Sequence, residues 1–140
     1  MEMIIDATGQ IAGRLASLVA KNAIKGYNIR VINSEKAIIS GRATYTEKYY
    51  KKKIDRGDPY HGPFYPKYPD QIMKRMVRGM IDYKKSTGQT ALKRVKVYLS
   101  VPEEFKDKKI TTLKGAESKF QHKQITLGDL SIKLGANKLW

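Results

Sequence analysis

Lysine, arginine and tyrosine side chains are interleaved between Arg42 and Lys96, and this combination can bind a polyanion. The segment holds 15 Lys or Arg residues against 5 Asp or Glu, a net charge of +10, whereas the rest of the 140-residue chain carries +5. Like charges this dense repel one another, and a polyanion relieves the repulsion. Because tyrosine rings can stack on bases while cations neutralise phosphates, the pattern indicates a nucleic acid.

Two short runs carry the strongest signal. Residues 48–53 read Lys-Tyr-Tyr-Lys-Lys-Lys, and residues 61–69 alternate aromatic residues with three prolines, which makes a stiff arm that loses little entropy on docking. A simpler explanation exists for each run: lysines on a helix often form only a solvated face, and the rings could pack on the protein's own core. Whether Tyr49, Tyr50 and Phe64 stack on bases or pack internally is left open.

The basic residues continue beyond these runs without any module that reads base edges. Such a spread of charge indicates recognition of RNA through its shape and backbone. Arg14, near the start of the first predicted helix, could face solvent or phosphate. The residues expected to contact RNA are Arg14, Arg42, Lys48, Lys51, Lys52, Lys53, Arg56, His61, Lys67, Lys74, Arg75, Arg78, Lys84, Lys85, Lys93 and Arg94.

Catalytic and metal-binding chemistry has no positive support in the sequence. The chain has no cysteine, which excludes disulfides, thiolate-bound metals and a thiol nucleophile. Its two histidines, His61 and His122, are far apart, so no metal site, cofactor or enzymatic activity is expected. The turn at residues 6–9 joins a strand to a helix, where α/β folds bind phosphate, but Gly9 and Gly13 match neither common nucleotide-binding pattern. A tight turn is the favoured explanation.

Hydrophobic periodicity predicts an α/β fold with a mainly parallel sheet. A strand at 3–6, a helix capped by Thr8 and a strand at 29–33 make a βαβ unit. Helices are predicted at 43–53 and from Asp70 to about Tyr83. A helical turn at 90–94 leads into a strand at 95–101, and a capping box at Thr126 and Asp129 opens a short last helix. Lys106, Lys108 and Lys109 are expected to form a solvated basic patch.

The chain is expected to be one domain over residues 1–140, with a basic, proline-rich and aromatic-rich RNA-binding insertion at about 54–69 and a tail from about 103. No signal peptide and no apolar run of membrane-spanning length is apparent, so a cytoplasmic protein without a membrane or small-molecule partner is expected.

Several ordered motifs resemble the universal large-subunit ribosomal protein L-thirteen family, in its archaeal–eukaryotic branch. They begin with Asp6-Ala7-Thr8-Gly9 and Gly13-Arg14-Leu15-Ala16, and the strand and turn at 31–36 and 39–41 follow. His61-Gly62-Pro63-Phe64, Val77-Arg78-Gly79-Met80, the run 92–98 and the archaeal-type close at 126–130 complete the series. Family members usually have Ala where Ser34 stands and Pro where Asp82 stands; Asp82 places a negative charge inside the basic segment.

The resemblance implies a three-layer α/β/α domain with a four-stranded parallel sheet. It also implies binding to large-subunit rRNA and neighbouring ribosomal proteins, with a structural role in subunit assembly and translation in the cytoplasmic ribosome. Two other functions are kept beside it. One is a nucleotide-dependent RNA-modifying enzyme built on the βαβ unit, and the other is a free RNA-binding translational regulator that acts on messenger RNA.

Overall fold

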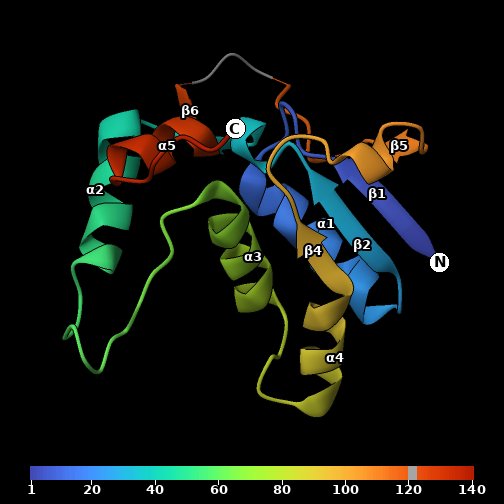
Figure 1. The fold of residues 1–140 in the computed structure, drawn as a ribbon, viewed down its shortest axis with the longest axis horizontal. Helices are drawn as coiled ribbons and strands as arrows, with labels where there is room; N and C mark the ends of the chain where they lie inside the picture. The colour runs from blue at the N-terminus through green and yellow to red at the C-terminus, as the bar shows by residue number, and fades with distance from the viewer. Residues whose placement is uncertain (120–122) are drawn as a thin grey trace.

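A four-stranded parallel sheet forms the centre of the protein (Figure 1). The computed structural model describes residues 1–119 and 123–140. His122 lies outside the described residues. The strands in sheet order are β4 (Val95–Val97), β2 (Asn28–Ile32), β1 (Glu2–Asp6) and β5 (Ile110–Thr111).

The predicted βαβ unit is confirmed at the N-terminus. β1 and β2 pair in parallel from Glu2 opposite Asn28 to Asp6 opposite Ile32, and the helix α1 (Ala12–Ile24) connects them. Gly26 follows the end of α1 with a φ of 103°, a left-handed conformation that favours glycine and stops the helix. The expected α/β class with a parallel four-stranded sheet is therefore present.

The two faces of the sheet are covered unequally. On one face, Ile5, Ile29 and Val31 join a large core with α1, α3 (Pro69–Met80) and α4 (Ser86–Arg94). On the other face, Ile4 and Ile32 meet Phe105 of the short 3-10 helix η2 (Glu103–Phe105), with Tyr98 and Val101 alongside. The second face is thus covered only by η2 and its flanking residues, while the first face is covered by α1, α3 and α4.

A small antiparallel sheet stands beside the main one. It pairs β3 (Ile38–Ser40) with β6 (Gln124–Thr126), and it is accompanied by α2 (Ala43–Ile54) and α5 (Leu127–Lys133). The predicted cap of the last helix is confirmed, since the Thr126 side chain accepts a hydrogen bond of 3.1 Å from the Asp129 backbone N–H. A second 3-10 helix, η1 (Ser34–Lys36), leads from β2 toward β3.

Several predicted boundaries were wrong. Thr8 does not cap α1, because Gln10 and Ile11 first form bridges to Glu117 and Ile38, and the helix begins only at Ala12. The helix predicted from Asp70 to about Tyr83 begins instead at Pro69, and Asp70 lies in its first turn. That helix ends at Met80, α4 is longer than predicted, and β4 is shorter than the strand expected at 95–101.

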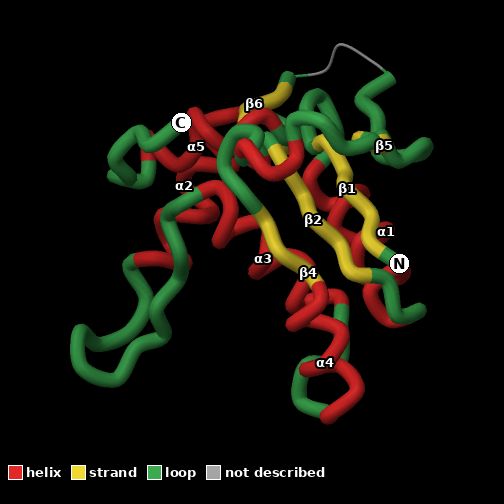
Figure 2. The backbone as a smooth tube through the Cα atoms, turned by 45° about the vertical axis from the view of Figure 1, so that its right-hand side comes forward, coloured by secondary structure: helices red, strands yellow, loops and turns green. Residues whose placement is uncertain are grey.

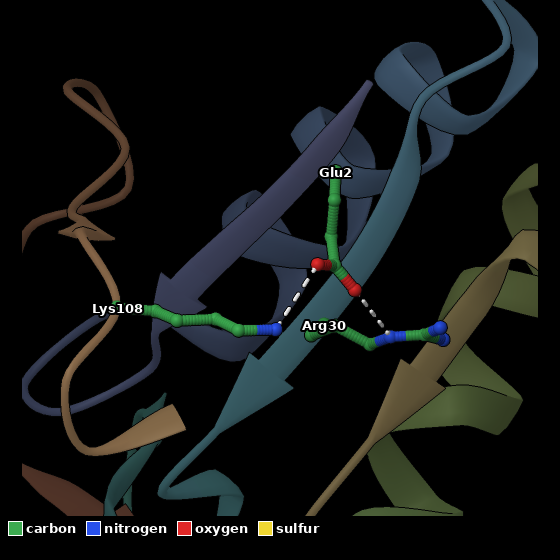
Figure 3. Close-up of polar contacts among 3 residues, drawn as sticks. All are labelled: Glu2, Arg30 and Lys108. Carbon is green, nitrogen blue, oxygen red and sulfur yellow. Dashed lines mark hydrogen bonds and ion pairs between the residues drawn. The ribbon is translucent and has the colours of Figure 1, made fainter. Parts of the chain in front are cut away.

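An ion-pair network ties together the η2-bearing face of the sheet (Figure 3). The Glu2 carboxylate lies 3.2 Å from Arg30 Nε and 3.5 Å from Lys108 Nζ. The positive charge of the Lys108 ammonium group is the main cause of the lowered pKa of the Glu2 carboxyl. Lys106 likewise lies 3.8 Å from Glu103. Two members of the predicted solvated patch, Lys106 and Lys108, are therefore paired with carboxylates.

The connection between α2 and α3, residues 55–68 and here called the arm, extends away from the sheet as a long loop (Figure 2). Its tip is closed by two backbone hydrogen bonds between Asp58 and Gly62, of 3.2 and 2.9 Å. Gly57 has a φ of 94°, and a Cβ atom there would lie 2.3 Å from the Gly62 carbonyl oxygen. The arm therefore has a defined shape although it contains no helix or strand.

Gly88 in α4 provides a test of how tightly the turn before this helix is packed. A Cβ atom at this buried position would lie 2.0 Å from the Asp82 carbonyl oxygen, so Gly88→Ala should destabilise the protein by about 1–3 kcal/mol through overpacking. Gly79→Ala is the matched control, because nothing lies within 4 Å of its Cβ position. It should be neutral or stabilise by up to about 1 kcal/mol. Urea denaturation measures both, and equal effects would contradict the packing argument.

Candidate nucleic-acid interface

The helix α2 presents three of its four lysines on one side because Thr46 and Tyr50, four residues apart, are buried on the other. Lys48, Lys51 and Lys52 are exposed and, with Asp55 and Arg56, line a shallow hollow. A second hollow beside it is lined by Arg42, Thr44, Tyr45 and Lys48. The structure therefore brings five of the predicted RNA-contacting residues, Arg42, Lys48, Lys51, Lys52 and Arg56, onto one continuous surface.

The only carboxylate within α2 is directed away from these lysines. Glu47 lies 3.6 Å from Lys133 of α5, which neutralises it on the side of α2 that contacts α5. The lysine-bearing side of the helix is therefore left with a net positive charge that no residue of α2 itself offsets.

The helix α3 adds cations in the same way. Ile72, Met73 and Val77 are buried against the core, which leaves Lys74 exposed. Arg75 and Arg78 are half-buried. The Arg78 guanidinium lies over the Tyr83 ring, 4.1 Å from its centre, and Arg75 lies 5.8 Å from the centre of the Tyr65 ring. Both arginines thus rest on aromatic rings that fix the direction of their side chains.

The remaining cations of the segment surround α4. Lys84, Lys85 and Lys93 are exposed, and the half-buried Arg94 donates a 3.4 Å hydrogen bond to the Ala23 carbonyl oxygen. Lys85 Nζ lies 2.8 Å from the Asp82 carboxylate, and this hydrogen bond raises the pKa of Lys85. Asp82, one of the two departures from the family pattern, therefore competes directly for one predicted phosphate contact.

The arm differs from the expectation of a basic insertion. Between residues 55 and 68, Arg56 and Lys67 are balanced by Asp55 and Asp58, so the net charge is zero with neutral histidine. His61 is exposed, and its Nδ1 lies 3.0 Å from Asp58 Oδ2. Hydrogen bonds from the Tyr60 backbone N–H and, to a lesser extent, with the His61 side chain hold the pKa of the Asp58 carboxyl below its usual range. Counting the acidic and basic residues between 55 and 68 in the sequence would have shown that the arm has no net charge.

The question left open for Tyr49, Tyr50 and Phe64 has two different answers. Tyr50 is 7% exposed and belongs to the core, where burial raises the pKa of its phenol. Tyr49 and Phe64 are 47% and 70% exposed and are accessible to a partner. Tyr60 at the arm tip, which was not singled out from the sequence, is 89% exposed. Accessible rings therefore occur on both α2 and the arm.

Lys53 is unlike its neighbours in the lysine run. It is half-buried, and its Nζ lies 4.3 Å from the centre of the Tyr49 ring, 5.2 Å from that of Tyr65 and 5.5 Å from that of Tyr50. The sequence places Lys53 in one run with Lys51 and Lys52, but the geometry directs its ammonium group inward.

Most of the predicted cations are free of carboxylates. Within the part of the chain that the structure describes, Lys85 and His61 alone among the predicted contacts lie within 4 Å of a carboxylate oxygen. Four other basic residues, Arg30, Lys106, Lys108 and Lys133, all have carboxylate partners. Among the described residues, 14 of the 15 Lys or Arg between Arg42 and Lys96 have no carboxylate within 4 Å, compared with nine of the 13 elsewhere. Unpaired positive charge is therefore densest in the segment that contains α2, α3 and α4.

The βα turn at residues 6–9 is closed by its own side chains. Asp6 Oδ1 accepts hydrogen bonds from the Thr8 backbone N–H (2.9 Å), the Thr8 hydroxyl (2.7 Å) and Asn33 Nδ2 (3.0 Å). Burial would raise the pKa of Asp6, but the hydrogen bonds from Thr8 and Asn33 together lower it, so the turn carries a negative carboxylate that would repel a nucleotide phosphate. Arg14 is exposed on α1, a different helix from the other predicted contacts.

The described residues, 1–119 and 123–140, contain no group of three or more His, Asp or Glu side chains placed to hold a metal ion. None of their helices is both long and apolar enough to span a membrane.

Comparison with known proteins agrees with the resemblance seen in the motifs. The family model described as ribosomal protein L13 matches residues 1–104. The large ribosomal subunit protein uL13 of Methanosarcina barkeri is 45% identical over 136 residues, which cover 95% of this chain and 97% of the relative. The proteins of the same name from Methanopyrus kandleri and Haloarcula marismortui are 45% and 41% identical, over 94% and 99% of this chain and 86% and 94% of the relatives. The chain therefore belongs to the ribosomal protein L13 family.

Proposed function

We propose that this protein, a structural constituent of the large ribosomal subunit by its family, binds large-subunit rRNA through α2, α3 and the surroundings of α4. The observation that carries the proposal is the set of cations without carboxylate partners among the described residues of these helices. A protein that folds with so many like charges without carboxylate partners along three helices is stabilised by a polyanion that neutralises them.

The proposed mechanism is charge neutralisation. Each lysine or arginine that meets a phosphate releases condensed counterions, and this release lets rRNA segments approach one another closely. The exposed residues Lys48, Lys51, Lys52 and Lys74 are proposed as the main phosphate contacts. Exposed aromatic rings on α2 and the arm are proposed to stack on unpaired bases, and neighbouring ribosomal proteins are proposed to cover other surfaces.

The location of the protein in cells tests the proposal as a whole. The protein should remain with large subunits through a salt wash that removes loosely held proteins, and ultraviolet crosslinking should join it to large-subunit rRNA. Recovery only in the free pool, or crosslinks mainly to messenger RNA, would instead support the free translational regulator.

Two lysines of α2 provide the first quantitative prediction. The slope of log affinity against log salt is negative, and the double variant Lys51→Ala with Lys52→Ala should reduce its magnitude by about 2. Each phosphate contact in a duplex contributes about 0.9 to that magnitude. The measurement is titration of a large-subunit rRNA fragment at several salt concentrations. Lys106→Ala with Lys109→Ala is the matched control, because it removes the same charge from exposed positions near β5 and should leave the slope nearly unchanged. Equal slopes for the two double variants would mean that the α2 lysines are only a solvated face.

Asp82 provides the second prediction, because it pairs with Lys85 at 2.8 Å. Asp82→Asn should free Lys85 for phosphate and tighten rRNA binding by about two- to fivefold at low salt, the range expected for releasing an exposed ion pair. Asp107→Asn removes the same charge from another exposed position and serves as the control. If both variants tighten binding equally, only net charge matters and the Asp82–Lys85 pair has no specific effect.

A further inference from the structure

Lys53 occupies the junction of α2, the arm and α3. Its ammonium group lies within 5.5 Å of the centres of three tyrosine rings, two from α2 and one, Tyr65, from the returning part of the arm. Lys51 and Lys52, its exposed neighbours, make no ring contact of this kind among the described residues. One lysine of the run is therefore engaged by the protein itself.

Tyr65 connects the arm to the body. Its ring centre lies 5.9 Å from that of Tyr50, which is buried in the core, and Tyr65 itself packs at the edge of that core. Arg75 of α3 approaches the same ring at 5.8 Å. Two cations from two helices thus meet one ring of the arm, and the negative face of a tyrosine ring attracts both.

The arm depends on this junction for its orientation. Its net charge is zero, so phosphates exert little net attraction on it as a whole. Its tip is closed internally by the Asp58–Gly62 hydrogen bonds, whereas Tyr60 and Phe64 are 89% and 70% exposed. Fixing the base of such a closed loop determines where its exposed rings point.

We propose that Lys53 is a positioning residue that, together with Arg75, holds Tyr65 and thereby orients the arm, rather than a phosphate contact of the α2 surface. To reach a phosphate, its ammonium would have to leave three rings that surround it in the free protein. The consequence for RNA affinity rests on the proposed function, but the orientation of the arm does not.

Three variants separate positioning from phosphate contact. Lys53→Met removes the cation and keeps the length of the side chain, Lys53→Arg keeps the cation, and Lys52→Met removes an exposed cation one residue earlier. Chymotrypsin should cut the arm after Tyr60 and Phe64 at a rate set by its opening. Without RNA, Lys53→Met should be cut about 2- to 30-fold faster than the native protein, the range that follows from the loss of a cation–π contact. Lys53→Arg and Lys52→Met should match the native protein.

Two further readouts distinguish a specific contact from general loosening. Ring currents should shift the NMR signals of the Lys53 ε-methylene upfield in the native protein and in Lys52→Met. This shift should decrease in Tyr65→Leu, where the rings of Tyr49 and Tyr50 still contribute. In rRNA titrations, Lys52→Met should lower the salt slope by about one, whereas Lys53→Met should weaken binding without changing the slope.

The proposal is overturned if Lys53→Met leaves the cleavage rate unchanged and lowers the salt slope as Lys52→Met does. It is also overturned if Lys53→Arg fails to restore the native cleavage rate while thermal melting shows it to be folded. If no variant alters rRNA affinity but Lys53→Met still exposes the arm, the positioning role stands and the proposed rRNA function fails. The protease and the titration therefore report on separate claims.

Discussion

The packing of α1 against the sheet is the contact on which the rest of the structure depends. Four of its six buried residues are alanines, and they let neighbouring backbones approach closely while Leu15 and Val19 fill the larger spaces. The helix α3 rests on this surface through Ile72, Met73 and Val77. Once those three side chains point inward, helical periodicity directs Lys74 outward. The position of the basic surface is thus a consequence of apolar burial on the opposite side.

The concentrated positive charge is partly relieved within the helices themselves. The last turn of α2 holds Lys51, Lys52 and Lys53, and the last turns of α3 and α4 hold Arg78 and Lys93 with Arg94. The negative end of the helix dipole stabilises a cation there by about 0.3–1 kcal/mol. Unlike a carboxylate, the dipole leaves the outward N–H groups of the exposed members, Lys51, Lys52 and Lys93, unoccupied. The free protein can therefore tolerate its charge and still offer it to phosphates.

The sequence predicted elements with strong periodicity and failed where long-range contacts decide. The βαβ unit, α2 and the cap at Thr126 follow from local patterns, and the ordered motifs identified the family. By contrast, β5 is two exposed residues, Ile110 and Thr111, that become a strand only by pairing with β1. Thr8 failed as a cap because residues distant in sequence pair with Gln10 and Ile11 first. Lys53 meets Tyr49 and Tyr50 of its own helix, but its third ring is Tyr65, twelve positions later, and no local pattern could reveal that contact.

The separation of charge between the helices and the arm divides the proposed rRNA binding into two parts with different physical origins. In that proposal, phosphate contacts of the α2 and α3 cations weaken as salt rises, because the counterions they release are already abundant. The arm has no net charge, and stacking by Tyr60 and Phe64 depends on aromatic surface rather than on counterions. Stacking is productive only if the rings are already directed at the bases, since ordering a free loop of this length would oppose binding. By holding Tyr65 at the base of the arm, Lys53 would therefore contribute more to this stacking than it would as one more phosphate contact on α2.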